Sequence, residues 1–403
     1  MVLSSIRGAS DLPRLGFFTT SSDLRHDPMQ FLTVPPTQIG RTITTAGTTG
    51  KPKHTYLTTS DWRRLTDLVA VGMRLNGITA GDVVHILYCY AESDWVVGPL
   101  LETAFQRLGV PTVQAGNALP IEEQVQLMRA RKSTVLMGTP SYLHRLTEEA
   151  QTCEPDLRSL GIRLMFLGAE AWSEGFRQYL QQRWGARVYD SYGMTEMGLA
   201  GGTECDRQDG LHTSPYLVFE VIDPDSGRAL EPGQEGELVV TTLRREAMPL
   251  IRYRTGDIAA VLPNTPCPCG IPTPRISRIK GRSDQMVCLG TGENLYPGDI
   301  DRALLGLPAI CGYQLTIGKQ GYKDTLTLLV ESEAPSQEMA DAIVQRLYQG
   351  LGFLEHDVRH SQTVAPPVVE FAAPGTLRAR SPIKIRRIVD QRRAPVDVDL
   401  PHG

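Results

Sequence analysis

Short apolar runs alternate with helical stretches along the first half of the chain. The apolar runs fall at 83–88, 110–113, 134–137, 162–167 and 187–189, and the helical stretches at 97–108, 121–131, 141–150 and 173–184. Short runs without polar alternation are typical of strands that are buried on both faces of a sheet. Strands interleaved with helices predict right-handed crossovers, so we expect an α/β fold with a parallel sheet.

The pattern changes after Gly202. Two strand patterns at 216–222 and 236–242 flank a turn, which predicts a β-rich subdomain over about 203–283. Later, helical patterns at 299–306 and 336–350 mix with strand patterns at 311–317, 325–331 and 367–371, which predicts a small α+β unit. We therefore expect a large N-terminal domain over 1–283 and a small C-terminal domain over 285–403.

The composition narrows the class of protein. The chain has 403 residues, 41% of them hydrophobic and 21% charged, with a net charge of −4, so it shows no basic footprint for nucleic acid or an anionic membrane. No apolar run approaches the roughly 20 residues that span a bilayer. The N-terminus lacks the apolar core of a signal peptide. We expect a cytoplasmic protein.

Two stretches carry the first candidate chemistry. Thr44–Lys53 combines glycines, hydroxyls and two lysines, which suits a loop that binds phosphate oxygens, although Pro52 stands where a Walker A motif needs Ser or Thr. Asp190–Glu196 places an acid, hydroxyls and a glycine at the expected carboxyl edge of the sheet, where ligands bind in α/β folds. Plainer interpretations are a flexible linker for the first stretch and a surface turn for the second.

Further motifs follow in a fixed order. They are Thr139–Tyr142, Leu167–Trp172, Glu204–Cys205 with Gly210–His212, Ile251–Asp257, Gly281–Asp284 and a late lysine, Lys384. Together with the two stretches above, they extend from about Thr44 to Asp390. This order resembles the adenylate-forming superfamily of acyl-CoA synthetases, and more narrowly the phenylacetate-CoA ligases and related aryl-acid activators. The resemblance implies ATP-dependent activation of an aromatic carboxylic acid to an acyl-adenylate, followed by transfer to a thiol.

The resemblance also implies a role for each motif. The residues that would bind the β- and γ-phosphates of ATP are Thr45, Gly47, Thr48, Thr49 and Gly50. Those that would hold the adenine and part of the acyl pocket are Gly168, Ala169, Glu170, Asp190, Ser191 and Tyr192. Thr195 would contact the α-phosphate and Glu196 would ligate Mg²⁺. Asp257 would accept the ribose hydroxyls, with Arg282 near the ribose or phosphate.

The small domain would take part through a rotation. By resemblance, Asp284 is the hinge and Lys384 the catalytic lysine, which the rotation exchanges for the thiol acceptor. Two positions depart from the family pattern: Ala46 replaces a hydroxyl residue of the loop, and Ile383 replaces the glycine that usually precedes the lysine. The implied acceptor is coenzyme A, although an enzyme that loads a carrier protein's phosphopantetheine would share all of these residues. Relatives are often homodimers.

Four residues form a candidate zinc site. Cys205, His212, Cys267 and Cys269 offer three sulfurs and one imidazole in two short pairs, as a closed tetrahedral site requires. Some phenylacetate-CoA ligases resemble this chain in having Cys and His at these places, which implies a structural zinc ion. The plainer interpretation is a set of free thiols on surface turns.

The acyl pocket is placed by resemblance at Tyr90, Trp95, Tyr142 and Gly193, where aromatic walls would suit a flat ring. Core packing is the competing role for the aromatic residues. Glu92 and Asp94 replace small or apolar residues of phenylacetate ligases, and we hypothesise that one of them meets a polar group of the substrate.

Two hypotheses from other classes of protein compete with the hypothesis of an enzyme. The first is a catalytically lapsed nucleotide-binding or regulatory protein, against which Glu196, Asp257, Arg282 and Lys384 argue. The second is a zinc-dependent nucleic-acid binder, which the net charge disfavours.

Overall fold

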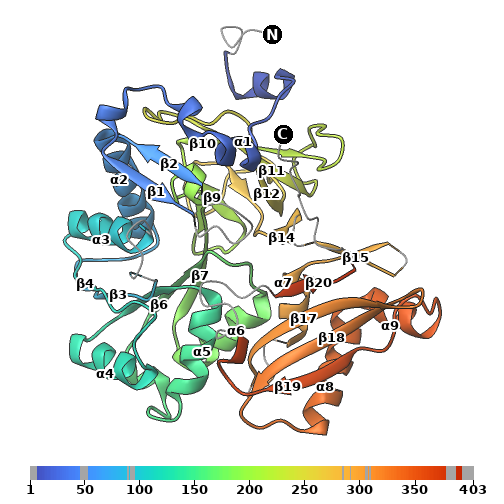
Figure 1. Cartoon of the computed structure of the whole chain (residues 1–403). Helices are drawn as coiled ribbons and strands as arrows, with labels where there is room; N and C mark the ends of the chain where they lie inside the picture. The colour runs from blue at the N-terminus through green and yellow to red at the C-terminus, as the bar shows by residue number, and fades with distance from the viewer. Residues whose placement is uncertain are drawn as a thin grey trace, which may run out of the picture. The chain divides into compact units, whose positions relative to one another are not determined.

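The computed structural model describes residues 7–45, 53–88, 90, 96–283, 286–290, 292–304, 307, 310–377 and 387–392. The chain folds into two compact units (Figure 1). The first holds residues 1–171 and 180–283, and the second holds residues 284–403 with the segment 172–179. Each unit has its own β-sheet and its own hydrophobic core.

The main sheet of the first unit has eight strands in the order β13-β9-β8-β7-β6-β5-β3-β4. The parallel part consists of β3 (Val84–Ile86), β4 (Thr112–Val113), β5 (Val135–Gly138), β6 (Leu164–Gly168) and β7 (Arg187–Tyr192). Every residue of β3, β5 and β6 is buried, as expected for strands that are covered on both faces. The prediction of an α/β fold is therefore confirmed.

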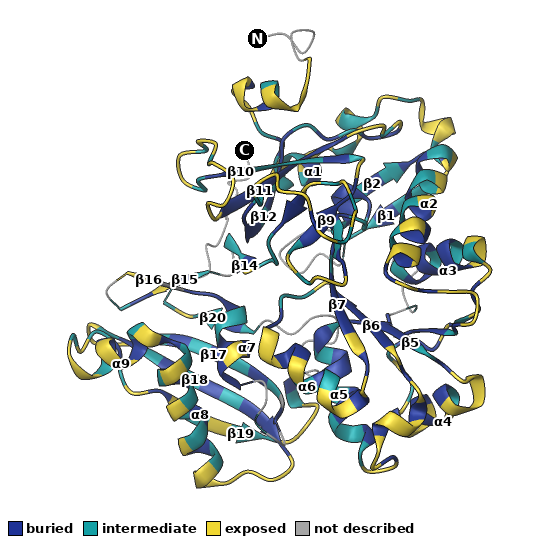
Figure 2. Ribbon diagram, turned by 180° about the vertical axis from the view of Figure 1, so that it is seen from behind, coloured by how far each residue is buried: buried dark blue, intermediate teal, exposed yellow. Residues whose placement is uncertain are grey.

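Helices pack on both faces of these strands, because successive side chains of a strand point to opposite sides. Val84 and Ile86 share a core cluster with side chains of α2 (Thr59–Leu75) and α3 (Val97–Leu108). His85, which lies between them in sequence, instead bonds Gln124 of α4 (Ile121–Arg131). The same half of the chain forms α5 (Pro140–Ala150), η5 (Leu157–Leu160) and α6 (Glu174–Trp184). Figure 2 shows β5 and β6 in the buried colour and the outer side of α4 exposed.

Two features of the first unit differ from the elements that the hydrophobic pattern predicted. The 17-residue helix α2 was not expected; it begins with a capping box in which Thr58 and Asp61 bond each other's backbone N–H. The main sheet also continues beyond β7, through the antiparallel strands β8 (Gly202–Glu204), β9 (Leu211–Thr213) and β13 (Arg275–Ile276). These strands satisfy the backbone groups that β7 would otherwise present as a sheet edge.

The remaining strands of the expected β-rich region form a separate antiparallel sheet. Its order is β10 (Leu217–Ile222), β11 (Gly236–Thr242), β12 (Tyr253–Ala259) and β14 (Gly281–Arg282). The segment 203–283 is thus divided between two sheets. A hairpin of β1 (Arg41–Thr44) and β2 (His54–Leu57) flanks the Thr/Gly-rich stretch. The short helices are η2 (Ala9–Arg14), α1 (Ser21–His26), η3 (Pro28–Phe31), η4 (Pro36–Gln38) and η6 (Thr195–Met197).

The second unit is built on a four-stranded sheet. Its order is β19 (Val368–Ala372), β18 (Lys323–Ser332), β17 (Ile310–Gln320) and β20 (Ile388–Asp390). The helices are α7 (Pro297–Leu304), α8 (Gln337–Gly350) and α9 (Gly352–Arg359), and a hairpin joins β15 (Val287–Leu289) to β16 (Glu293–Leu295). Within the described ranges of both units, no helix is long and apolar enough to cross a membrane.

His85 places a titratable group inside the core of the first unit. Its side chain is fully buried, with Nε2 2.9 Å from Gln124 Oε1 and Nδ1 3.0 Å from Ser133 Oγ. Because the Gln124 amide donates to Gly116 O, its oxygen faces the ring, so Nε2 carries the proton and Nδ1 accepts from Ser133. Burial lowers the pKa of His85 to about 4, although the bond to Gln124 acts in the opposite direction.

We predict that His85 makes folding less stable as the pH falls from about 6.5 to 4. In that window the unfolded imidazole binds a proton and the folded one does not, so the free energy of unfolding decreases with acidification. Replacing the group in His85→Gln should remove about 3 kcal/mol of this pH dependence. Urea unfolding at pH 7 and pH 4 measures it, with His26→Gln, a change at an exposed histidine, as the control. Equal acid sensitivity of all three proteins would contradict the prediction.

Candidate active site

The parallel pairing of β6 and β7 brings two of the motifs together. Leu167 lies opposite Asp190 and Gly168 opposite Ser191. The Ser191 hydroxyl donates to Leu167 O at 2.9 Å. A Cβ on Gly168 would lie 2.7 Å from Ser191 Oγ, so this position requires glycine. The carboxyl ends of β6 and β7 therefore present their turns side by side at one edge of the sheet.

The turn after β6 is strained and anchored. Ala169 has a φ of +72°, the left-handed region that L side chains rarely adopt, and such strain is concentrated at functional sites. Glu170 then accepts from Ser141 N at 3.0 Å and from Ser141 Oγ at 2.7 Å at the start of α5. These bonds fix the turn against a neighbouring element of the sheet edge.

Asp190 is held from two sides. Its backbone N–H donates to Glu204 Oε2 at 2.7 Å, and its carboxylate accepts from Arg278 Nε at 2.8 Å. Glu204 is fully buried and lies 4.0 Å from the same Arg278 nitrogen. Two acids thus share one guanidinium, which offsets the cost of burying their charge. The sequence motifs included Glu204 without a role and gave no local signal for Arg278.

Asp257 lies at the end of a second buried network. The Tyr192 hydroxyl donates to its Oδ2 at 2.7 Å, and Arg282 Nη1 donates to its Oδ1 at 3.1 Å. Asp257 and Arg282 are also opposite each other in the β12–β14 pairing. Burial, together with the charge of Asp257, raises the pKa of Tyr192 well above 10, so its hydroxyl remains a donor at neutral pH. The arrangement points a carboxylate, a phenol and a guanidinium toward one another.

Glu196 of η6 meets the hairpin that flanks the Thr/Gly-rich stretch. Its Oε1 forms an ion pair with Lys53 and accepts from the Tyr253 hydroxyl at 3.1 Å. Lys53 is tied to Thr45 by two hydrogen bonds, from Thr45 N to Lys53 O and from Lys53 N to Thr45 Oγ1. The sequence predicted Lys53 as one of two lysines of a phosphate-binding stretch, but not its ion pair with Glu196. Tyr253 lies in the Ile251–Asp257 motif that the sequence analysis identified.

The remaining expected residues have varied settings. Thr195 is buried at the start of η6, and Tyr142 is buried on α5. The Tyr90 ring packs on Gly98 of α3 so closely that a Cβ there would lie 2.5 Å from it, and it joins the apolar core. The Tyr90 ring therefore packs against the core, and its place in an acyl pocket stays a prediction. The expected residues outside the described ranges are Gly47, Thr48, Thr49, Gly50, Trp95, Asp284 and Lys384, as are Ala46, Glu92, Asp94 and Ile383.

Cys205, His212, Cys267 and Cys269 come together in the first unit. Their ligand atoms all lie within 4.8 Å of one another. Cys205 Sγ is 3.7 Å from Cys267 Sγ, and Cys269 Sγ is 3.2 Å from His212 Nε2. A tetrahedral zinc ion with Zn–S bonds of ~2.3 Å separates its sulfur ligands by roughly 3.8 Å, so the spacing fits this metal.

Backbone N–H groups donate to two sulfurs of the Cys/His cluster. The backbone N–H of Arg207 donates to Cys205 Sγ and that of Ile271 to Cys269 Sγ, each at 3.4 Å. Thr273 Oγ1 lies 3.4 Å from His212 Nδ1, which orients the imidazole with Nε2 toward the sulfurs. β9 and β8 connect this cluster to β7, the strand that carries Asp190.

These networks lie at the carboxyl edge of the parallel sheet, where α/β proteins bind ligands, and comparison with known proteins gives the family. The family model of the AMP-binding enzyme matches residues 12–243, and that of the AMP-binding enzyme C-terminal domain matches residues 292–392. The chain therefore belongs to the AMP-binding enzyme family.

Similar proteins narrow the class. The phenylacetate-coenzyme A ligase of Aromatoleum evansii is 32% identical over 397 residues, which are 96% of this chain and 86% of the relative. That of Pseudomonas putida is 33% identical over 94% of this chain and 84% of the relative. A crystal structure of 2-hydroxyisobutyryl-CoA ligase in the postadenylation state is 27% identical with a TM-score of 0.84, covering 97% of this chain and 83% of that one. The prediction of an AMP-forming acid–thiol ligase is confirmed.

Gly193 gives a test of how the site is packed. A Cβ at this position would lie 1.9 Å from Leu199 O, so Gly193→Ala must displace the turn that leads to Thr195 and Glu196. We predict a loss of stability of about 2 kcal/mol, in the range of overpacked interiors, together with weaker nucleotide binding. Gly72→Ala on α2 is the control, because no atom lies within 4 Å of its added Cβ and alanine favours a helix. Thermal unfolding and ATP titration measure both effects; an unchanged Gly193→Ala protein would contradict them.

Proposed function

We propose that this protein uses ATP and Mg²⁺ to convert an aromatic carboxylic acid to an acyl-adenylate, releases pyrophosphate, and transfers the acyl group to the thiol of coenzyme A. The observation that carries the proposal is the meeting of Lys53 with Glu196. It joins Lys53, at the end of the Thr/Gly-rich stretch, to the acid of η6, which supports one common site for phosphate binding and for Mg²⁺. The named activity of the phenylacetate-coenzyme A ligases supports it.

The first step brings two anions together, since a carboxylate attacks the α-phosphorus. Catalysis is then largely charge neutralisation and alignment. Lys53 and Thr45 would receive the β- and γ-phosphates with Gly47, Thr48, Thr49 and Gly50, and Thr195 would contact the α-phosphate. Lys53 and Tyr253 both reach Oε1 of Glu196, and Oε2 is the oxygen that we assign to Mg²⁺. A carboxylate oxygen suits this hard cation, which would neutralise phosphate charge.

The nucleoside would lie at the edge formed by β6, β7 and β12. Asp257, fixed by Tyr192 and Arg282, would accept the ribose hydroxyls. The strained turn at Gly168, Ala169 and Glu170 would face the adenine together with Asp190 and Ser191. Glu204 and Arg278 would position Asp190 without touching the nucleotide.

The acyl site and the second step are assigned to further residues. Tyr90, Trp95, Tyr142 and Gly193 would line the acyl pocket, with Glu92 or Asp94 meeting a polar substituent of the ring. Lys384 would stabilise charge in the adenylation step, and Asp284 would be the hinge through which the small domain exchanges this lysine for the thiol. Loading of a carrier protein's phosphopantetheine is the alternative second step.

The test of this function is acid-dependent exchange of labelled pyrophosphate into ATP across phenylacetate, benzoates, aminobenzoates, hydroxybenzoates and indole carboxylates. We predict a clear signal with at least one aryl acid. Glu196→Gln should lower the exchange rate by ~10²-fold, because it removes a charge that stabilises the transition state. Glu235→Gln, which changes an exposed acid paired with Lys280, is the matched control.

The acceptor is decided in a second assay. Coenzyme A or a phosphopantetheinylated carrier protein is added to the acid that supports exchange, and the thioester is measured. Thioester on coenzyme A supports the proposal, whereas thioester on the carrier alone supports the alternative. An absence of exchange from a folded protein across the whole panel would contradict adenylation of an aryl acid.

We also propose that the Cys/His cluster holds a structural zinc ion. Three sulfurs and one imidazole close a tetrahedron and leave no open position for a substrate. The ligands come from the loop after β8, from β9 and from the loop before β13, so the ion would bind together segments that are separate in sequence. The zinc ion would crosslink these loops and thereby stabilise the edge of the main sheet.

We predict about one zinc ion per chain in protein purified without chelator, measured by atomic emission. Cys269→Ser should lose most of the metal and lower the unfolding temperature by several degrees, because metal binding contributes directly to folding. Cys153→Ser, at an exposed cysteine outside the cluster, should keep both at the wild-type level. Wild-type protein that is purified without chelator and contains no zinc would refute the proposal.

A further inference from the structure

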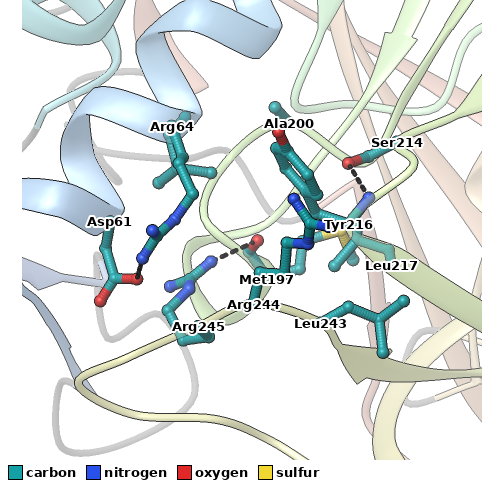
Figure 3. A pocket seen from close by; sticks show the side chains of 11 residues that line it. Asp61, Arg64, Met197, Ala200, Ser214, Tyr216, Leu217, Leu243, Arg244 and Arg245 are labelled. Atoms are coloured by element: carbon teal, nitrogen blue, oxygen red, sulfur yellow. Dashed lines mark hydrogen bonds and ion pairs between the residues drawn. The ribbon is translucent and has the colours of Figure 1, made fainter.

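A pocket on the first unit has no role in the proposed function. It lies next to η6, between α2 and the loop after β11, and contains about 300 Å³ of space free of protein atoms, part of it open to solvent. Its lining includes the apolar or aromatic side chains of Leu65, Leu217 and Tyr216. It also includes three arginines, Arg64, Arg244 and Arg245 (Figure 3).

The acids beside these arginines already have partners. Asp61 accepts from the backbone N–H groups of Thr58, Glu246 and Ala247 at 2.8 to 3.1 Å, and from Arg64 Nη2 at 3.1 Å. Burial alone would raise the pKa of Asp61, but these bonds outweigh it and lower the pKa. Glu246 pairs with Arg64 at 2.7 Å and accepts from Thr58 Oγ1 at 2.9 Å. Arg64 is therefore neutralised by both acids.

Arg245 is not neutralised in the same way. Its Nη2 donates to Met197 O at 2.9 Å, but Nη1 is buried without a hydrogen-bond partner among the described residues. Burial lowers the pKa of Arg245 to about 10, so it is still charged at neutral pH. A buried charged donor without a partner raises the free energy of the empty protein. An anion in the pocket would offset the charge of this guanidinium and so lower that free energy.

Arg244 adds a second cation at the mouth of the pocket. It is exposed, and within the described ranges it forms no hydrogen bond or ion pair. Its φ of +52° is in the left-handed region, which is strained for a side chain of this size. Figure 3 draws Arg245 with its bond to Met197 O, and Arg244 among the other residues that line the pocket. Two arginines that line one pocket, neither of them in a described ion pair with an acid, match the charge of a phosphate.

We propose that this pocket binds the phosphate group of a ligand, with Arg244 and Arg245 holding the phosphate and the apolar lining residues contacting any organic part. The Arg245 bond to Met197 O would connect the bound anion to η6, which also carries Thr195 and Glu196. Two sources supply this chemistry: the terminal ribose phosphate of coenzyme A, in which case the inference rests on the proposed function, and free inorganic phosphate.

The experiment is calorimetric titration of the full chain with coenzyme A, dephospho-coenzyme A and inorganic phosphate. The variants are Arg244→Gln, whose side chain has no described partner to lose, and Arg245→Lys, which keeps the charge but not the paired donors. Arg63→Gln is the matched control, because Arg63 is an exposed arginine of α2 outside the pocket. Unfolding curves establish that each variant is folded.

We expect Arg244→Gln and Arg245→Lys to weaken binding of a phosphate-bearing probe at least tenfold, and Arg63→Gln to leave it unchanged. If the loss affects coenzyme A and is absent for dephospho-coenzyme A, the source is the terminal phosphate. If it affects inorganic phosphate alone, the source is free phosphate. The inference is overturned if no probe loses affinity in the folded Arg244→Gln protein, or if Arg63→Gln loses as much.

Pyrophosphate exchange in the same preparations separates this inference from the proposed function. Exchange with an aryl acid, combined with probe binding that does not depend on Arg244, overturns only the phosphate pocket. Binding of inorganic phosphate that depends on Arg244, in a protein that is silent in exchange, overturns only the adenylation proposal.

Discussion

The register of β6 against β7 is the constraint on which the candidate site depends. It sets Gly168 against Ser191, so closely that no side chain fits at Gly168, and it brings the strained Ala169 turn beside Asp190. β7 is in turn paired on its other side with β8, which places Glu204 under the backbone of Asp190. A shift of one residue in either pairing would reverse the faces of all these side chains.

Each buried acid near this edge of the sheet is paired with hydrogen-bond donors, because an unpaired buried charge would destabilise the fold. Glu196 with Lys53, Asp257 with Tyr192 and Arg282, and Asp190 with Arg278 each combine an acid with donors that offset its desolvation. These donors hold the carboxylates in fixed positions in the absence of any ligand. Preorganised charge of this kind is effective because little reorganisation is needed during the reaction.

The Cys/His cluster and the arginine pocket both include residues close in sequence to η6 (Thr195–Met197). The loop after β8 begins the cluster, while η6 between β7 and β8 borders the pocket through Met197. Both features therefore connect to the segment that carries Thr195 and Glu196. Under the proposed function, the position of Thr195 and Glu196 would therefore depend on both features.

The sequence by itself determined the α/β class, most of the strands and helices, and the motif residues, because hydrophobic periodicity and glycine-rich turns are local properties of the chain. It missed α2, whose start is a side-chain cap, and the antiparallel strands β8, β9 and β13, which are too short to carry a period. Only the tertiary structure decided which charges meet. Lys53 with Glu196, Arg278 with Asp190 and Arg245 with Met197 O join positions far apart in sequence, so no local pattern specifies them.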